Sequence, residues 1–154
     1  MNHRRIAVFP GTFDPITLGH YDVIIKSLNL FDKIVIAIGN NSEKNNMFSV
    51  KKRKEWIQKT FLDFSGIEID LFKGLTISFC KRKKAKFLLR GIRNQLDFEF
   101  EKNLYYANKK LYDCIETVFI LSSYERSYIS SCLVREIIKN GGNYTIFVPN
   151  SVRI

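Results

Sequence analysis

The amino-acid sequence predicts an α/β fold in which a doubly wound parallel sheet of five strands carries helices on both faces. Five short apolar runs alternate with longer helix-like stretches along the 154 residues, an order typical of repeated strand–helix units. The runs are almost continuously apolar, as strands covered on both faces must be. No internal repeat, linker or low-complexity segment interrupts this order, so we expect one domain over residues 1–154.

The first elements follow from apolar clustering near the N-terminus. RIAVF at 5–9 predicts a buried strand, and KIVIAIG at 33–39, rich in β-branched residues, predicts a second. Between them, helical spacing over 20–31 places one set of residues on one side: Val23, Ile24, Ser27, Leu28 and Phe31.

The middle of the chain continues the same order. Residues 49–64 predict a helix whose apolar face consists of Val50, Trp56, Ile57, Thr60 and Phe61. IEIDLF at 67–72 alternates in polarity and predicts the third strand, and 75–84 predicts a short helix.

The last elements complete five strand–helix units. Strands are predicted at 86–90 and 117–121, a long helix at 96–112, and a helix at 130–140 that Gly141–Gly142 would end in a left-handed cap. This pattern is Rossmann-like. In such sheets ligands bind beyond the carboxyl ends of the strands, a rule that selects the loops at 10–20, 39–48, 73–76, 90–95 and 122–131.

Composition bounds the function classes. The chain carries 25 basic and 15 acidic residues, a net charge of +10, which attracts anions such as phosphorylated small molecules or nucleic acid. No apolar stretch approaches the ~18 residues that a membrane span needs, and the N-terminus lacks the pattern of a signal peptide. We therefore expect a cytoplasmic protein without a membrane partner. The three cysteines are widely separated and support neither a disulfide framework nor a zinc site.

The loop GTFDPITLGH at 11–20 predicts a phosphate site. Gly11 allows a close backbone approach to a ligand, and Gly19–His20 opens the first helix. Free N–H groups and the helix dipole favour an anion there. A cationic or hydrogen-bond-donating imidazole of His20 would add to the same positive field.

Several motifs carry a resemblance to a known family. TLGH at 17–20 resembles the H-x-G-H element of the nucleotidyltransferase superfamily, with Thr17 in place of the first histidine, and ISSCLVR at 129–135 resembles its second signature. FPGTFDPITLGH (9–20), LRGIRNQLDFEFE (89–101) and YISSCLVREI (128–137) resemble the bacterial phosphopantetheine adenylyltransferase family. The resemblance covers nearly the whole chain.

This resemblance implies a reaction and its partners. The chain would transfer AMP from ATP to 4'-phosphopantetheine, giving dephospho-CoA and pyrophosphate, by in-line attack without a covalent intermediate. Mg²⁺ would accompany ATP, and no carboxylate cluster marks a protein site for the ion. The resemblance also suggests a homohexamer with CoA as a feedback ligand.

The resemblance assigns roles to named residues. His20 would stabilise charge on the α-phosphate, Thr12 would orient the attacking phosphate, and Lys44 and Arg90 would neutralise it. The residues expected to bind ATP are Thr12, Phe13, His20, Gly91, Ile92, Arg93, Glu101, Arg126, Ser127, Tyr128, Ile129, Ser130, Ser131 and Cys132. The residues expected to bind 4'-phosphopantetheine are Thr12, Lys44, Thr76 and Arg90.

Helical spacing adds a shared face. Asp97, Glu101, Leu104 and Asn108 lie at i, i+4, i+7 and i+11, so they share one side of the long helix. That side is expected to point into the site, although Asp97 taken alone is expected to be an ordinary solvated carboxylate. The serines at 130 and 131 are expected to offer hydroxyls and N–H groups to the β- and γ-phosphates.

Some positions depart from the family pattern and leave alternatives open. Cys132 stands where a third Ser or Thr is usual, Arg126 where an aromatic residue is frequent, and Phe9 where Tyr is usual. A nucleotidyltransferase acting on another phosphate acceptor is one alternative, which the RGIR and DFEFE elements disfavour. A nucleic-acid-binding module is another, but we interpret the basic runs at 51–54 and 81–84 as solvated helix faces and expect no nucleic-acid partner.

Overall fold

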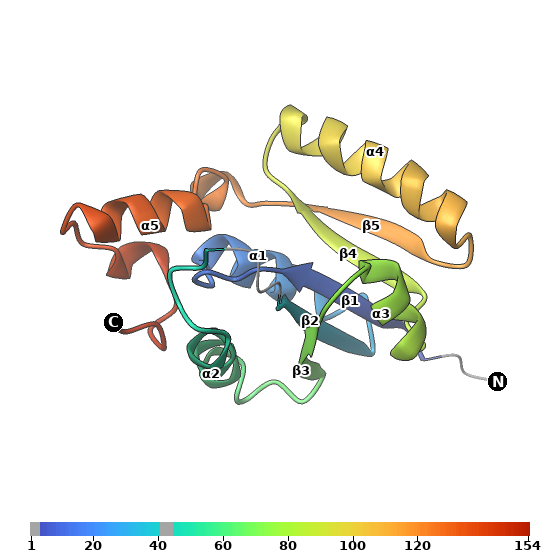
Figure 1. Ribbon diagram of the computed structural model, residues 1–154, viewed down its shortest axis with the longest axis horizontal. Helices are drawn as coiled ribbons and strands as arrows, with labels where there is room; N and C mark the ends of the chain where they lie inside the picture. Colours follow the sequence, from blue (N-terminus) through green and yellow to red (C-terminus); the bar gives the residue numbers. More distant parts are fainter. Residues whose placement is uncertain (1–3, 41–44) are drawn as a thin grey trace.

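A parallel five-stranded sheet forms the centre of the computed structural model, which describes residues 4–40 and 45–154. The strands lie in the order β3-β2-β1-β4-β5 (Figure 1). Every neighbouring pair is parallel. Their bounds are β1 (Ile6–Gly11), β2 (Lys33–Gly39), β3 (Ile67–Phe72), β4 (Phe87–Ile92) and β5 (Glu116–Leu121). The predicted fold class and all five predicted strands are confirmed.

The helices lie where the sequence predicts them, with ends that differ by a few residues. They are α1 (Leu18–Ser27), α2 (Val50–Thr60), α3 (Thr76–Arg82), α4 (Gln95–Leu111) and α5 (Ser131–Lys139), with short 3-10 turns η1 (Tyr124–Arg126) and η2 (Thr145–Phe147). Helix α1 starts earlier than expected because Thr17 caps it, accepting a hydrogen bond from the backbone N–H of His20. Gly141, with φ of +71°, follows α5 in the expected left-handed conformation.

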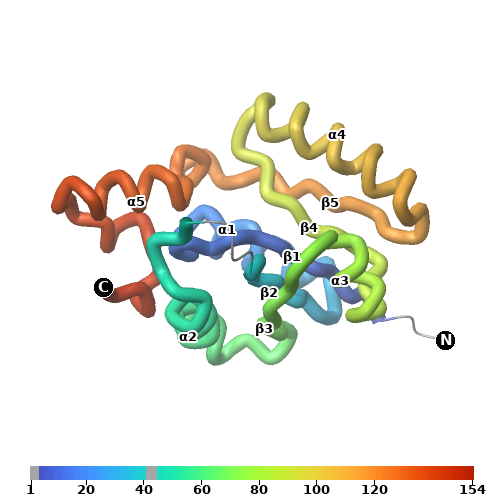
Figure 2. The backbone as a smooth tube through the Cα atoms, viewed as in Figure 1, coloured from blue at the N-terminus to red at the C-terminus, as the bar shows by residue number. Residues whose placement is uncertain are grey.

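Alternating side chains of the central strands divide the core into two layers. Ile34, Ile36 and Ile38 of β2 point to the face that α1, α2 and α5 cover, where Ile24, Ile57 and Val134 are fully buried. Val35 and Ala37 point to the opposite face and pack with α3. The C-terminal segment returns to α2, where the hydroxyls of Thr60 and Ser151 lie 2.6 Å apart (Figure 2). No helix in the described part of the chain is both long and apolar enough to cross a bilayer.

The strand order places a crevice between β1 and β4. The chain moves outward from β1 to β3 on one side and then continues at β4 on the other side, so the order reverses between β1 and β4. Loops that leave the carboxyl ends of these two strands therefore diverge to opposite faces. The loops after Gly11 and Ile92 border this crevice.

Candidate active site

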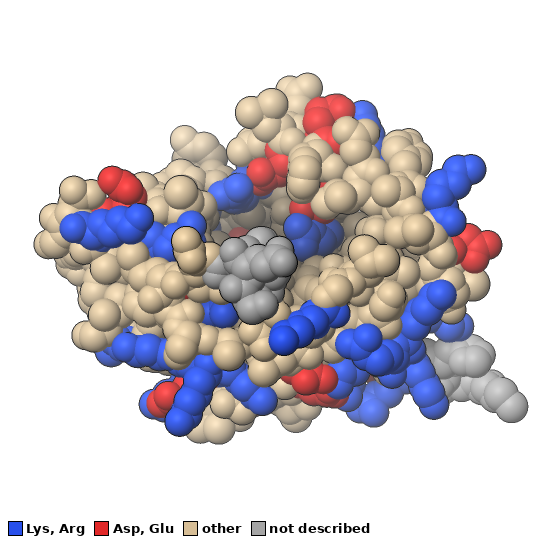
Figure 3. All heavy atoms as spheres, in the orientation of Figure 1, with Lys and Arg blue, Asp and Glu red and all other residues tan. Residues whose placement is uncertain are grey.

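One cavity opens beyond the carboxyl ends of β1 and β4, and a second adjoins it along β4, β5, α4 and the start of α3. The first has a volume of about 380 Å³ and is lined by Phe9, Pro10, Gly11, Thr12, Thr17, Gly19, His20, Val23, Arg90, Gly91, Arg93, Asp97, Glu101, Ser122, Ile129, Ser130 and Ser131. The second, of about 280 Å³, is lined by Pro10, Leu75, Thr76, Ile77, Leu88, Arg90, Glu101, Leu104, Tyr105, Asn108 and Thr117. Arg90, Glu101 and Pro10 belong to both, so they form the junction between the cavities. A hollow in the middle of the face drawn in Figure 3 has Lys and Arg atoms at its rim.

His20 is held at the first cavity by the start of α1. The backbone N–H of Thr17 donates to Nδ1 of His20 at 3.1 Å, so Nδ1 carries no proton. Burial, reinforced by the Arg93 and Arg90 guanidinium groups, lowers the pKa of His20 to about 4. The imidazole is therefore neutral at pH 7 with its proton on Nε2. Because Nδ1 is tied to the helix cap, Nε2 is the donor left for a ligand in the cavity.

The loop before α1 supports that ring from below. Phe13 adopts φ of 51°, and its buried ring packs edge-on against His20 with centroids 4.9 Å apart. A Cβ at Gly11 would meet the Phe13 ring at 2.9 Å. A side chain at Gly11 would therefore displace the Phe13 ring. Phe13 packs behind His20 and does not line the cavity.

Arg90 is oriented by a buried carboxylate. Its Nε donates to Glu101 Oε2 at 2.9 Å and its Nη2 to Oε1 at 2.5 Å, a paired geometry that fixes the plane of the guanidinium. Its Nη1 donates to the Pro10 carbonyl at 3.2 Å. Glu101 is buried. The geometry makes Glu101 a residue that holds Arg90, in addition to the nucleotide contact expected from the sequence.

Arg93 is oriented in the same way by Asp97. Its Nε and Nη2 donate to the two Asp97 oxygens at 2.9 and 3.2 Å. Burial alone would raise the pKa of Asp97, but hydrogen bonds from the Arg93 side chain and backbone N–H outweigh it and lower that pKa. The expectation that Asp97 is an ordinary solvated carboxylate is wrong, since the i,i+4 spacing pairs it with an arginine of the preceding loop.

The expected face of α4 is present. Asp97 and Glu101 line the first cavity, and Glu101, Leu104 and Asn108 line the second. Thr76, at the start of α3, lies across the second cavity from α4.

The start of α5 offers backbone N–H groups more than hydroxyls. Ser130 caps the helix, and its Oγ accepts from the Leu133 N–H at 3.1 Å. The Ser131 hydroxyl donates to the Pro15 carbonyl at 2.8 Å. The Ser131 proton is thus committed to the protein, contrary to the expectation that both hydroxyls face phosphate.

The remaining expected residues differ in where they lie. Ile92 is buried in β4, and Ile129 lines the first cavity. Arg126, Ser127, Tyr128 and Cys132 do not line either cavity. The Arg126 guanidinium instead lies 5.9 Å from the Tyr21 ring and 3.9 Å from Asp22. Lys44 falls outside the described residues.

Three charged residues escaped the sequence analysis. Asp14 accepts from the N–H groups of Met47 and Phe48 at 2.8 and 2.9 Å, and Asp22 accepts from the Ser123 N–H and hydroxyl at 2.8 and 2.9 Å. Arg53 is 2% exposed, so the interpretation of 51–54 as a solvated face is wrong at this position. A signal was available, because Arg53 stands three and four residues before Trp56 and Ile57 on the apolar face of α2.

Within residues 4–40 and 45–154, no group of three His, Cys, Asp or Glu side chains lies close enough to hold an ion. The two carboxylates of the first cavity are bound to Arg90 and Arg93, which leaves them poorly suited to coordinate a cation.

Comparison with known proteins places this site in a family. A cytidylyltransferase-like family model matches residues 8–137. Phosphopantetheine adenylyltransferases of Flavobacterium psychrophilum and Flavobacterium johnsoniae are each 51% identical over 150 residues, which is 97% of this chain and 99% and 98% of those proteins. The crystal structure of a bifunctional NMN adenylyltransferase/ADP ribose pyrophosphatase from Francisella tularensis superposes with a TM-score of 0.74 at 19% identity, over 97% of this chain and 46% of that one. That last likeness supports the fold alone. The identity and coverage of the Flavobacterium proteins show that this chain belongs to the phosphopantetheine adenylyltransferase family, among the cytidylyltransferase-like nucleotidyltransferases.

Proposed function

We propose that the protein catalyses reversible transfer of AMP from ATP to 4'-phosphopantetheine, giving dephospho-CoA and pyrophosphate. The observation that carries this proposal is the meeting of two cavities at Arg90, with neutral His20 beside the junction. Such an arrangement can bring two phosphorylated substrates together at one place. The relatives that are half identical to this chain are named for the same activity.

The chemistry needs positioning and charge neutralisation more than a protein nucleophile. A phosphate oxygen of 4'-phosphopantetheine attacks the α-phosphorus of ATP, the bond to the β-phosphate oxygen breaks, and pyrophosphate leaves. Nε2–H of His20 donates to an α-phosphate oxygen as negative charge develops on it. A neutral donor suits this task, since it keeps its proton throughout.

Each cavity has a suitable occupant. The first, with Gly91, Arg93 and the N–H groups at the start of α5, takes ATP, because helix N-termini and guanidinium groups bind phosphate oxygens. The second, with Thr76 and apolar side chains such as Leu104, takes the pantetheine arm. Arg90 then contacts the attacking phosphate at the junction. Thr12 orients that phosphate, and Lys44 adds a second cation by the family resemblance.

Outside the first cavity, the assignment rests on the family resemblance. Arg126, Ser127 and Tyr128 belong to the segment that follows β5, and Cys132 lies in the first turn of α5. We propose that these residues border the nucleotide. Phe13 and Ile92 contribute through their backbones, because their side chains are buried.

Mg²⁺ is proposed as the companion of ATP. Bound to the triphosphate, it would neutralise part of the charge of the leaving pyrophosphate. The carboxylates of the cavity are engaged by arginines, so triphosphate oxygens and water are its suitable ligands. The protein's own contribution to charge neutralisation is Arg90, Arg93 and the helix starts.

We further propose a cytoplasmic homohexamer in which residues 1–154 form one nucleotidyltransferase domain and CoA acts as a feedback ligand. An apolar stripe on α4 supports self-association. It consists of Leu96, Phe100, Ala107 and Leu111, which are exposed along one side of the helix. These positions span a narrow arc at 100° per residue, about a quarter turn from the side that bears Glu101.

Turnover in the presence of ATP, Mg²⁺ and 4'-phosphopantetheine tests the proposal. Pyrophosphate and dephospho-CoA should both form, and His20→Ala should lower kcat by about 10²–10³. ATP binding by the variant, measured calorimetrically, should persist because the other phosphate donors remain. Turnover only with another acceptor, such as nicotinamide mononucleotide or glycerol phosphate, would contradict the choice of substrate. Salt-sensitive nucleic-acid binding without turnover would contradict the enzyme assignment.

A further inference from the structure

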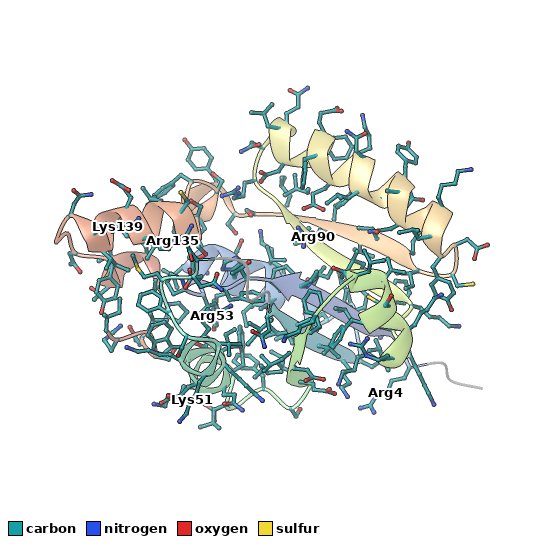
Figure 4. All side chains as sticks on the ribbon, in the orientation of Figure 1. Arg4, Lys51, Arg53, Arg90, Arg135 and Lys139 are labelled. Carbon is teal, nitrogen blue, oxygen red and sulfur yellow. The ribbon has the colours of Figure 1, made fainter. Side chains whose placement is uncertain are left out.

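Arg53 is a buried cation directly behind the phosphate loop. It is 2% exposed and projects from α2 toward the ends of the central strands, whereas Lys51 lies at the outer edge of the same helix (Figure 4). Burying a guanidinium is costly unless its N–H groups are satisfied. The hydrogen bonds that justify this burial therefore show what the side chain holds in place.

Those hydrogen bonds join three separate segments of the site. Nη1 donates to the Thr12 carbonyl at 2.6 Å and to the Gly39 carbonyl at 3.4 Å. Nε donates to the Phe48 carbonyl at 3.1 Å. One side chain thus ties together the loop after β1, the end of β2 and the residues before α2.

A second brace runs between two of these segments. The buried Asp14 carboxylate accepts from the N–H groups of Met47 and Phe48 at 2.8 and 2.9 Å. The Asp14 carbonyl accepts from Arg135 Nη1 at 2.7 Å. The positions on both sides of Phe13 are therefore anchored, Thr12 by Arg53 and Asp14 by the residues before α2 and by Arg135 of α5.

The Thr12 contact decides which groups the loop presents to a ligand. Thr12 lines the first cavity but Arg53 does not, so the Thr12 carbonyl points behind the cavity wall. A carbonyl turned into the cavity would repel phosphate oxygens. We propose that Arg53 is a positioning residue for the adenylyl transfer: it fixes the Thr12 peptide so that donors, and not a carbonyl, face the phosphates. This inference rests on the proposed function.

The charge of Arg53 contributes to the same end. Burial lowers the pKa of Arg53 and the nearby Asp14 carboxylate acts in the opposite direction; a guanidinium keeps its charge in proteins. A buried charge is screened less by salt than a surface charge. Arg53 therefore adds positive field beneath a loop that must hold anions.

Two substitutions separate charge from hydrogen-bond geometry. Arg53→Met removes the charge and the hydrogen bonds but keeps a long side chain. Arg53→Lys keeps the charge, but its ammonium group cannot donate to the three carbonyls with the geometry of a guanidinium. We expect Arg53→Met to lower kcat by about 10²-fold, the effect typical of a small misplacement in a reacting geometry. Arg53→Lys should recover about tenfold of that loss and stay about tenfold below the unmutated chain, because an ammonium cannot reproduce all the hydrogen bonds of the guanidinium. The KM for ATP should change less than kcat.

Controls on the same helix isolate positioning from stability and net charge. Ile57→Ala removes a fully buried side chain of α2 that is apolar and so donates no hydrogen bond to the loop, and Lys51→Met removes an exposed charge. Both should keep kcat per folded molecule, although Ile57→Ala should melt at a lower temperature.

The outcomes are distinct. A kcat of Arg53→Met within about twofold of Ile57→Ala, or equal kcat values for Arg53→Met and Arg53→Lys, would overturn the inference. If Arg53→Met does not fold, Arg53→Lys is compared with the unmutated chain, and an unchanged kcat with a lowered melting temperature would overturn it. The unmutated chain in the same assay reports on the proposed function alone, so the two failures are told apart.

Discussion

At the scale of single residues, His20 shows how local structure fixes both the tautomer and the charge of a side chain. The Thr17 N–H occupies Nδ1, and burial with two nearby arginines lowers the pKa of His20 to about 4. The same contact that caps α1 therefore leaves the proton of the His20 ring on Nε2. The sequence left open whether this imidazole is cationic or a neutral donor, and the structure favours the neutral donor.

That pKa predicts a pH dependence of stability. The folded value of about 4 lies below the ordinary value of 6.5, so between these pH values the unfolded chain binds the proton more readily. The stabilisation is complete above pH 6.5 and is lost as pH falls toward 4. Between pH 7.5 and 5 the unmutated chain should lose about 1–2 kcal/mol more unfolding free energy than His20→Gln. Urea titrations at both pH values measure this difference, and parallel losses in the two proteins would contradict it.

The role of a residue could be predicted where adjacent residues form a motif. It could not be predicted where the role depends on a contact with a residue far away in the sequence. The histidine at the start of α1, Arg90 near the end of β4 and Arg93 just after that strand could be recognised from adjacent residues. The hydroxyl of Ser131 could not, because its acceptor is the carbonyl of Pro15, 116 positions away along the chain. Arg53 was hidden in a basic run although it falls on the apolar face of its helix.

At the scale of elements, the periodicity of apolar residues was sufficient to place the strands β1 to β5 and the helices α1 to α5. Strand ends and helix ends were less predictable, since caps such as Thr17 and continued pairing at Gly11 and Ile92 extend the elements beyond their apolar runs. The strand order was not predicted, because the sequence does not state which parallel strands become neighbours. It is this order that brings the β1 and β4 loops together.

The contact between β4 and α1 permits a test at this scale. A Cβ at Gly91 would meet Cγ2 of Val23 at 2.8 Å, and a buried β-branched side chain cannot easily turn away. Gly91→Ala should therefore cost about 1–3 kcal/mol of unfolding free energy. Val23→Ala removes the obstructing methyl groups, so the double variant should be more stable than the sum of the single effects.

A double-mutant cycle from denaturant unfolding measures this coupling. We expect a favourable interaction energy of at least about 0.5 kcal/mol, the level above which contacting sites depart from additivity. Additive effects would mean that the sheet and helix separate slightly to accept the methyl group. The close contact with Val23 would then not explain why residue 91 is a glycine.

At the scale of the whole molecule, charge and apolar surface serve different purposes. The chain carries 25 basic and 15 acidic residues, and the two arginines that line the first cavity are held by carboxylates, an arrangement that suits phosphorylated small molecules. The apolar stripe on α4 lies on a different side of that helix from Asp97 and Glu101. Catalytic and associating surfaces can therefore share one helix without competing for the same residues.

The stripe predicts how the proposed oligomer can be broken. Phe100 is 63% exposed and Leu96 is 82% exposed, and such adjacent apolar side chains are typical of surfaces that bury themselves against a partner. Phe100→Glu would place a charge in that contact and should shift the protein to smaller species, because an unpaired buried charge is strongly unfavourable.

Light scattering after size-exclusion chromatography measures the mass of the Phe100→Glu variant. Leu62→Glu, at another leucine that is 80% exposed, is the matched control and should leave the mass unchanged. Equal masses for the unmutated chain and Phe100→Glu would exclude the stripe as the interface between copies, whatever the number of subunits.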